Sequence, residues 1–288
     1  MADGESSGIV GETGSGKSTL GKAVLEILPP RTKVAGHIFF RGKELGRLDG
    51  ERIRHVRGEE VALIFQDPMT RLNPLMTIED HFVETMREHQ RVSRQEALAK
   101  AATSLASMRV PESRIQNYPH EFSGGMRQRI MIALALVLNP SLLVADEPTT
   151  SLDVIVEAQI LEILEDLKRR YKMSLLLITH NLGIVAEVCD TVAVFYAGKI
   201  VEIGSADDIF NRPVHPYTRL LLQSIIHLNT KELHSIEGLP PDLVSPPSGC
   251  RFHPRCPYAQ PVCREKIPPL EQFRPDQLAA CHFGKDFL

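Results

Sequence analysis

Residues 9–19 read Ile-Val-Gly-Glu-Thr-Gly-Ser-Gly-Lys-Ser-Thr, and this stretch decides the fold. From Gly11 to Ser18 it has the spacing G-x-x-x-x-G-K-S, whose glycines let the backbone turn tightly and aim its N–H groups at a polyphosphate. At this spacing Lys17 reaches the β- and γ-phosphates, and the Ser18 hydroxyl reaches Mg²⁺. Apolar residues before Gly11 end a strand, and residues 19–28 read as a helix, as a phosphate-binding loop requires. A chance glycine-rich turn would not have these flanks. The residues expected to contact a nucleotide are Gly11, Glu12, Thr13, Gly14, Ser15, Gly16, Lys17, Ser18 and Thr19.

The composition is that of an ordinary globular protein. The 288 residues are 43% hydrophobic and 24% charged, which suggests one large domain or one domain with an extension. A formal net charge of −3 gives no support to a nucleic-acid-binding surface. No apolar run reaches the roughly 18 residues of a membrane span, and residues 1–5 lack the features of a signal peptide. We therefore expect a cytosolic chain.

Strands and helices alternate along the chain. Short apolar runs predict strands, and amphipathic runs predict helices, with a capping box at Ser93–Glu96. Alternation of this kind implies an α/β fold, a parallel sheet with helices on both faces. After about residue 211 prolines crowd the sequence, and from residue 238 we expect an irregular appendage. The expected strands are 36–41, 61–65, 142–145, 174–178 and 191–196, and the expected helices are 78–108, 123–138, 154–171, 182–188 and 216–226.

Polar residues follow three of the buried strands. Asp146 can hold Mg²⁺ through its water shell, and Glu147 is placed to activate an attacking water as general base. Gln66 could reach Mg²⁺ or water, and His180 could reach the γ-phosphate. Taken singly, each has a plainer interpretation: a solvated acidic turn, a polar strand cap or a structural histidine. Their combination with Lys17 at successive strand ends favours a catalytic site.

A second anion-binding element precedes the helix expected at 123–138. Ser123, Gly124 and Gly125 stand at its N-terminus, where backbone N–H groups and the helix dipole favour an anion. One γ-phosphate needs only one such element from its own chain. The second is therefore expected to serve a partner.

Four of the five cysteines lie in the last forty residues. Cys250, Cys256, Cys263 and Cys281 are separated by five, six and seventeen residues, so they form no C-x-x-C pair of a zinc ribbon. In a cytosolic chain this grouping suggests metal before disulfides, with loose thiols as the alternative. Four thiolates can hold a [4Fe–4S] cluster, and nearby histidines at 253 and 282 leave zinc open. Cys189, on an apolar helix, reads as a small buried hydrophobe.

Together these motifs resemble those of the ATP-binding subunits of ABC transporters. Gly11–Ser18 matches Walker A, Leu142–Asp146 matches Walker B, and Ser123–Gln128 looks like the signature sequence. The resemblance implies a P-loop NTPase with a RecA-like parallel-sheet core and an inserted helical subdomain at about 78–138. It also implies a dimer with a second ABC ATPase subunit, in which each signature faces the other subunit's Walker A. The remaining correspondences are Gln66 with the Q-loop, Glu147 with the catalytic glutamate, Ser151-Leu152-Asp153 with the D-loop and His180 with the switch histidine.

Further segments resemble the oligopeptide/dipeptide importer branch: Glu121–Arg129, Ala145–Thr150, His215-Pro-Tyr-Thr218 and Gly249–Pro257. The branch implies an ATP-binding domain at 1–232 and a metal-binding extension at 233–288, whose four cysteines hold a [4Fe–4S] cluster. It implies Mg²⁺ and ATP as cofactors, with Ser18, Gln66 and Asp146 as magnesium ligands. Two membrane permease subunits and an extracytoplasmic solute-binding protein are the implied partners. The subunit would then lie peripherally on the cytoplasmic face of the membrane.

The sequence departs from the family pattern in two places. Family members begin with strands carrying an aromatic that stacks on adenine. Here these are absent before Walker A, so either an upstream segment with an aromatic tightens ATP binding or this chain holds adenine by other means. Asn181 stands where Asp is usual.

Three other functions remain open. The solute could instead be nickel, glutathione or an oligosaccharide. A soluble non-transport ABC ATPase would usually carry two cassettes or a coiled-coil insertion, and the third alternative is a metal-dependent regulator.

Overall fold

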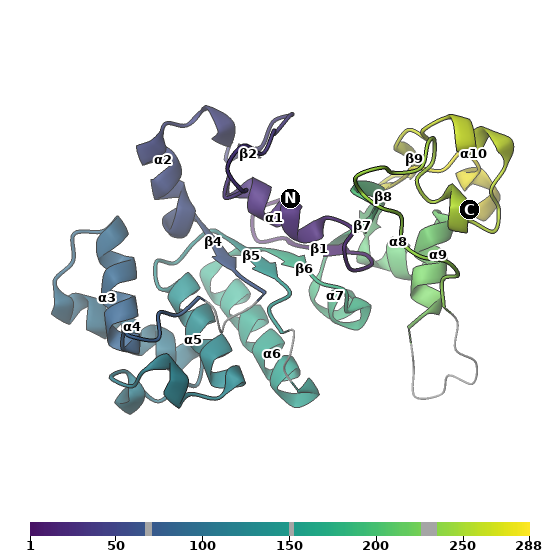
Figure 1. The fold of residues 1–288 in the computed structure, drawn as a ribbon. Coiled ribbons are helices and arrows are strands. Elements are labelled where there is room, and N and C mark those ends of the chain that lie inside the picture. Colours follow the sequence, from purple (N-terminus) through teal and green to yellow (C-terminus); the bar gives the residue numbers. More distant parts are fainter. Residues whose placement is uncertain (67–70, 150–152, 226–234) are drawn as a thin grey trace. The chain divides into compact units, whose positions relative to one another are not determined.

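The structure, a computed structural model, describes residues 1–66, 71–149, 153–225 and 235–288 (Figure 1). They form two compact units. The first unit holds residues 1–4 and 21–176, and the second holds residues 5–20 and 177–288. The chain passes from one unit to the other between Gly4 and Glu5, within helix α1 (Lys17–Val24) and within strand β6 (Ser174–Ile178).

The first unit contains the strands that carry the acidic residues. Strands β4 (Val61–Ile64) and β5 (Leu142–Asp146) pair in parallel, with Ile64 opposite Ala145. Strand β6 follows β5 in the order of the sheet. The continuous apolar runs predicted these strands correctly, because a strand buried on both faces carries no polar alternation. The expected strand at 36–41 is only the hairpin of β2 (Phe39–Phe40) and β3 (Lys43–Glu44).

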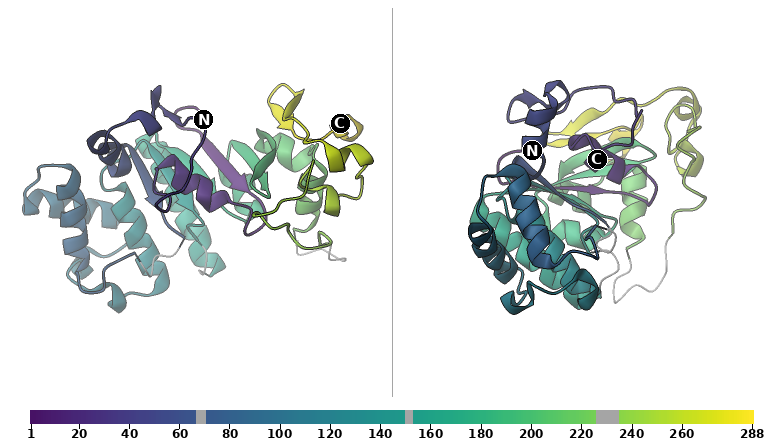
Figure 2. Two further views of the ribbon diagram at one scale, coloured as in Figure 1. Left: turned by 45° about the horizontal axis from the view of Figure 1, so that its top comes forward. Right: turned by 60° about the vertical axis from the view of Figure 1, so that its left-hand side comes forward.

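Helices α3, α4 and α5 lie side by side in the same unit (Figure 2). The helical pattern expected over 78–108 is two helices, because Ser93 caps α4 and makes the predicted capping box with Glu96. Their buried faces carry large apolar side chains, among them Phe82 and Ile130. The helices of this unit are α2 (Gly50–His55), α3 (Ile78–His89), α4 (Arg94–Ser107), α5 (Gly124–Leu136) and α6 (Val154–Tyr171), with irregular or 3₁₀ turns at Leu45–Arg47, Val56–Glu60, Glu112–Arg114 and Pro119–Glu121.

The second unit has a mixed sheet. Strand β1 (Ser6–Val10) pairs in parallel with β7 (Thr191–Tyr196), and β7 pairs antiparallel with β8 (Lys199–Ser205). Its core gathers Val10, Val194 and a group of buried aromatic rings. The helices are α7 (Leu182–Val188), α8 (Ala206–Asn211), α9 (Pro216–Gln223) and α10 (Pro261–Glu265), with 3₁₀ turns at His253–Arg255 and Gly284–Phe287.

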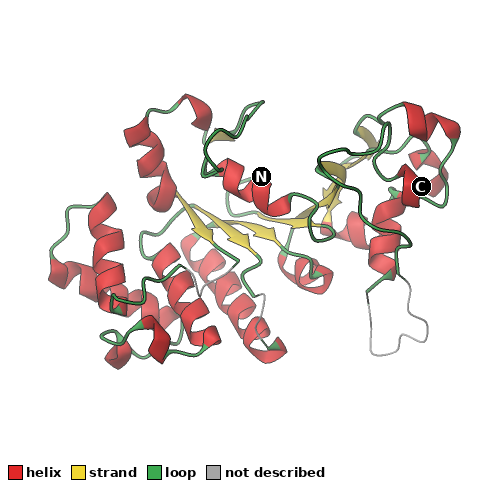
Figure 3. Ribbon diagram, in the orientation of Figure 1, coloured by secondary structure: helices red, strands yellow, loops and turns green. Residues whose placement is uncertain are grey.

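The C-terminal segment is more ordered than the sequence predicted. Figure 3 shows long loops there, but strand β10 (Gln277–Ala279) pairs with β8 and with β9 (Glu271–Arg274), so the expectation of a wholly irregular appendage is wrong. A three-residue strand is too short to show periodicity. Its Gln277 is buried, and the side-chain amide is satisfied by donating to the Glu202 carboxylate at 2.8 Å.

The sequence also placed a domain boundary between residues 232 and 233, which lies outside the described residues. The helix expected at 216–226 ends at Gln223. Among the helices that the structure describes, none has both the length and the apolar character needed to cross a bilayer.

Candidate nucleotide-binding and catalytic site

The phosphate loop lies in the second unit, between β1 and α1. At Gly11 a Cβ atom would lie 2.0 Å from the carbonyl oxygen of Phe195, so no other residue fits. Gly14 has φ +80°, a conformation that L side chains rarely adopt. The Ser15 carbonyl accepts from the Gly198 N–H at 2.8 Å, which ties the loop to the turn between β7 and β8. The loop is therefore shaped by its own glycines and by contacts with β7 and the turn that follows it.

Lys17 is buried inside this loop. Its Nζ donates to the carbonyl oxygens of Gly11 at 2.8 Å and Glu12 at 2.9 Å, and lies 3.4 Å from the Ser15 Oγ. Only 5% of the residue is exposed. These contacts hold the ammonium at the centre of the loop, toward which a bound phosphate would be drawn. Ser18 and Thr19 follow in the first turn of α1, so the helix expected at 19–28 begins two residues earlier and ends at Val24.

His180 belongs to the same unit. The residue before it, Thr179, donates its N–H to the Ile9 carbonyl at 3.1 Å, which places the end of β6 beside the end of β1. His180 is exposed. Asn181 caps α7 by accepting from the Gly183 N–H at 3.1 Å, so the departure from the family's Asp retains a helix-capping side chain.

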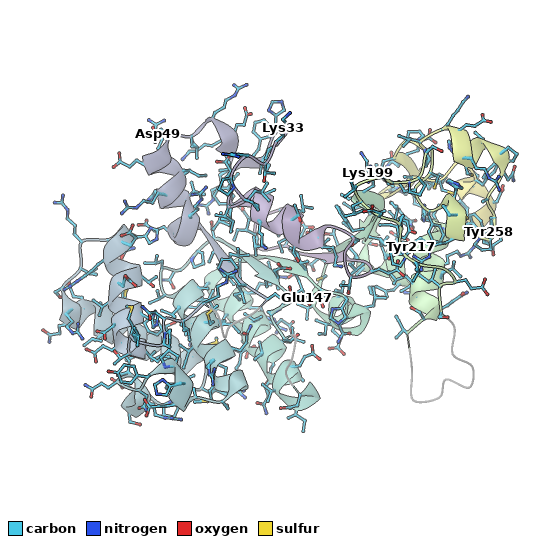
Figure 4. All side chains as sticks on the ribbon, viewed as in Figure 1. Lys33, Asp49, Glu147, Lys199, Tyr217 and Tyr258 are labelled. Atoms are coloured by element: carbon cyan, nitrogen blue, oxygen red, sulfur yellow. The ribbon has the colours of Figure 1, made fainter. Side chains whose placement is uncertain are left out.

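The acidic residues lie in the first unit, at the end of β5. Asp146 and Glu147 are 5% and 9% exposed. The Gln66 side-chain amide donates to the Glu147 carboxylate at 2.8 Å, so the ends of β4 and β5 bring these predicted residues together. Glu147 has φ +47°, which is uncommon for a residue other than glycine. Asp146 and Glu147 thus end a buried strand in a constrained turn. Figure 4 labels Glu147.

Two further residues hold this turn and were missed in the sequence. The Gln128 amide donates to the Pro148 carbonyl, and the Thr149 hydroxyl donates to Glu157 at 2.6 Å. Gln128 stands within the signature stretch, on α5 four residues past Gly124, and is buried. No local pattern marks Gln128 or Thr149, because their partners lie 20 and 8 positions away.

The predicted second anion site lies at the N-terminus of α5. Ser123 caps the helix, with its Oγ accepting from the Met126 N–H at 3.4 Å. Ser123 and Gly124 are exposed, whereas a Cβ at Gly125 would meet Val156 at 3.1 Å. Of the D-loop, Ser151 and Leu152 lie outside the described residues, as does Thr150 before them. Asp153 caps α6.

The four C-terminal cysteines line one small cavity of about 20 Å³ in the second unit. Burial raises the pKa of the Cys250 and Cys256 thiols and raises that of Cys281 to about 12, and the neighbouring thiols add to these shifts. In the part of the chain that the structure describes, no three His, Cys, Asp or Glu side chains are arranged to hold a single metal ion. In the predicted metal-binding extension the four thiols therefore line one cavity, but the described side chains form no site for a single metal ion.

The phosphate loop and the acidic strand end define a P-loop nucleotide-binding protein. Residues 1–150 match the family model described as ABC transporter, and residues 201–263 match that of the oligopeptide/dipeptide transporter C-terminal region. The chain belongs to the ATP-binding proteins of ABC transporters, within the oligopeptide/dipeptide group.

Curated relatives agree along nearly the whole chain. It is 50% identical to a probable peptide ABC transporter ATP-binding protein of Sinorhizobium fredii, over 98% of this chain and 86% of that protein. It is 46% identical to an oligopeptide transport ATP-binding protein of Salmonella typhimurium, over 96% and 84%. A dipeptide transport ATP-binding protein of Bacillus subtilis is 48% identical, over 95% and 83%.

Solved structures support the fold. CbiO1 of Clostridium perfringens, part of an ABC transporter complex, matches with a TM-score of 0.64 and 26% identity over 74% of this chain and 82% of that one. The ATP-binding cassette MJ0796, a dimer bound to ADP and phosphate, matches with a TM-score of 0.64 and 24% identity over 72% and 87%. The α/β fold of an ABC ATPase is thereby confirmed.

Proposed function

We propose that this chain hydrolyses ATP to drive the import of oligopeptides or dipeptides through a membrane ABC transporter. The observation that carries the proposal is the buried Lys17 ammonium, held by the carbonyl oxygens of Gly11 and Glu12 within a glycine-shaped loop. The identity of 46–50% to peptide-transport ATP-binding proteins supports the solute class. The ATPase need not touch the solute, so nickel, glutathione or an oligosaccharide stays the second candidate.

Each site residue has a proposed role. Lys17 and the loop N–H groups bind the phosphates, and Ser18, Gln66 and Asp146 would hold Mg²⁺. The metal supplies charge neutralisation on the phosphate oxygens. Glu147 takes a proton from the attacking water at its carboxylate, and the amide of Gln66 orients that carboxylate through the 2.8 Å hydrogen bond. His180 contributes a hydrogen bond to the γ-phosphate.

The proposed partners follow from the exposed elements. The N-terminus of α5, at Ser123–Gly125, offers N–H groups to the ATP of a second ABC ATPase subunit. Two permease subunits and an extracytoplasmic solute-binding protein complete the assembly, which would keep this chain peripherally on the cytoplasmic face of the membrane.

A cavity of about 470 Å³ in the first unit is the proposed seat of a permease helix. It is walled by α3, α5 and the stretch after β4. Its lining is largely apolar with a few charges, which suits the apolar face of an amphipathic cytoplasmic helix. Its lining residues include Phe65, Arg71, Leu72, His81, Glu84 and Met131.

The cysteine segment, residues 250–281, is proposed to hold a [4Fe–4S] cluster, with zinc as the second choice. All four thiols line one cavity. Burial raises the pKa of Cys281, and the nearby Cys250, Cys256 and Cys263 thiols add to that shift. Zinc needs its ligands about 2.3 Å from one point, whereas a cluster spreads its four cysteines more widely. The support for the cluster is therefore the convergence of the four thiols on one cavity.

The experiment that tests hydrolysis is Glu147→Gln in the assembled transporter. The change keeps the shape and removes the base, so ATP turnover should fall by roughly 10²–10⁴-fold while ATP binding persists. Lys17→Ala is the matched comparison, because it should weaken binding itself. A Glu147→Gln subunit that hydrolyses ATP at the wild-type rate would contradict the assignment.

A further inference from the structure

Arg255 lies in the cysteine segment yet contacts the phosphate loop. Its guanidinium meets the Glu12 carboxylate with two hydrogen bonds, from Nη1 at 2.7 Å and from Nη2 at 2.9 Å. Only 5% of the Arg255 side chain is exposed, against 23% of Glu12. A bidentate pair that is this shielded fixes geometry more firmly than a surface ion pair does.

All five N–H donors of Arg255 are engaged. Besides the two bonds to Glu12, Nε donates to the Glu237 carbonyl at 2.9 Å and Nη2 donates to the Ile236 carbonyl at 3.2 Å. Nη1 also lies 3.4 Å from the Tyr196 hydroxyl. Lysine offers a point charge and cannot reproduce this fork. The site is therefore built for arginine.

The main chain of Glu12 is held at the same place. Its N–H donates to the hydroxyl of Tyr217 at 3.0 Å. Tyr217, labelled in Figure 4, comes from α9 and packs against Tyr196 and Phe252, with ring centroids 4.5 Å and 5.3 Å away. Phe252 also lines the cavity of the four cysteines. The C-terminal segment thus grips both the side chain and the backbone of one loop residue.

Glu12 also contacts the lysine of the loop. The carbonyl oxygen of Glu12 accepts from the Lys17 Nζ at 2.9 Å, so Glu12 is bonded to Arg255 on one side and to Lys17 on the other. A shift of Glu12 would move the carbonyl that orients the ammonium. The position of the phosphate-binding charge therefore depends on a residue 243 positions away in the sequence.

We propose that Arg255 is a positioning residue for ATP: through Glu12 it holds the phosphate loop in its binding conformation, so the cysteine segment sets the affinity of the chain for ATP. The proposal rests on the proposed ATP-binding function. Neither the Arg255–Glu12 pair nor this dependence follows from the motifs themselves, because Glu12 occupies an unspecified position of the loop pattern.

The test is an equilibrium titration of the full-length chain with Mg²⁺ and a fluorescent ATP analogue. Arg255→Gln should raise the midpoint about tenfold with the bound stoichiometry unchanged, a change typical of coupling between sites. Arg255→Lys should be intermediate, and Arg264→Gln, which removes an exposed charge of the same segment, should match wild type. A merely structural role would lower the stoichiometry and leave the midpoint alone, which would overturn the proposal.

A double mutant identifies the route. Because Arg255 acts through Glu12, Arg255→Gln should have little further effect in a Glu12→Gln background. Additive losses, or a wild-type midpoint for Arg255→Gln, would overturn the proposal. Amide hydrogen exchange without nucleotide separates its failure from that of the proposed function. If no ATP binds to wild type, faster exchange at residues 12–16 in Arg255→Gln still supports the loop clamp, and unchanged exchange overturns it.

Discussion

Single residues at the end of β5 carry backbone strain where chemistry is proposed. Glu147 sits at φ +47°, and a non-glycine residue held there costs on the order of 1–3 kcal/mol. The Gln66 amide bonds its carboxylate, and Gln128 bonds the Pro148 carbonyl of the next residue. These contacts keep the carboxylate in one orientation. The strain is thus sustained by neighbours that belong to the proposed catalytic turn.

At the same scale, His215 provides a pH-dependent prediction. Burial lowers its pKa to about 3, while an unfolded histidine titrates near 6.5. Between these values the unfolded chain binds the extra proton, so stability falls as the pH drops below 6.5. His215→Asn should keep the cap on Tyr217, because its side-chain oxygen can replace the Nδ1 that accepts the Tyr217 N–H at 3.0 Å.

We expect wild type to lose about 2 kcal/mol more stability than His215→Asn between pH 7 and pH 5. Urea unfolding at the two pH values measures this difference. Glu202, whose carboxylate accepts from the His215 N–H at 2.9 Å, has a pKa raised by burial and contributes the opposite trend. Since Glu202 is present in both proteins, it largely cancels. Identical pH dependence in the two would show that His215 does not govern acid stability.

Among the elements, α5 links two functional features of the first unit. Its N-terminus, capped by Ser123, presents exposed N–H groups, and Gln128 one turn later holds the turn after β5. A displacement of this helix would move both the N–H groups at its N-terminus and the Gln128 contact with the turn after β5. The helix therefore offers a rigid connection between the surface proposed for a second ATPase subunit and the proposed general base.

The loop before α3 gives a prediction about the membrane partner. Residues 71–76 are the part of this loop that the structure describes. Leu75 is 85% exposed, close in sequence to the proposed permease cavity. Cysteine at Leu75 should therefore form crosslinks with the membrane subunit in isolated membranes, detected by mass spectrometry. Arg170→Cys, exposed on α6 and outside the cavity lining, is the control. Capture from position 170 alone would contradict the placement.

Over the whole molecule, the C-terminal segment is part of the second unit rather than a loose tail. Strand β10 extends the sheet beyond β8, and Arg255 joins the segment to the phosphate loop. Among its described residues, the hydrophobic side chains that are buried are those of Phe252, Cys263 and Ala279. A bound metal group would supply the stability that so small a core lacks.

Metal content tests that proposal. Anaerobic purification should give a brown chain with about four irons, because each [4Fe–4S] cluster uses four cysteines. Cys256→Ser should bleach the protein and expose the segment to proteolysis. Cys189→Ser, a buried cysteine at the end of α7, should do neither. Iron is measured by elemental analysis, and a colourless anaerobic preparation containing one zinc would reject the cluster.

Local patterns in the sequence determined much of this protein. The spacing from Gly11 to Ser18 specified the loop, since its glycines and lysine act within eight residues. The runs at 142–145 and 174–178 specified buried strands, and Ser93 and Ser123 marked helix starts, because capping bonds reach only three residues. These features depend on neighbours in the chain, so a single sequence contains them.

Only the tertiary structure decided the contacts between distant residues. Gln66 meets Glu147 across 81 positions, and Arg255 meets Glu12 across 243. Strand β10 is recognisable only because β8 offers it a hydrogen-bonding edge. Ion pairs and short edge strands leave no periodic trace in sequence, since their partners are set by folding. The phosphate loop could therefore be predicted from the sequence, whereas its contact with the cysteine segment depends on the tertiary fold.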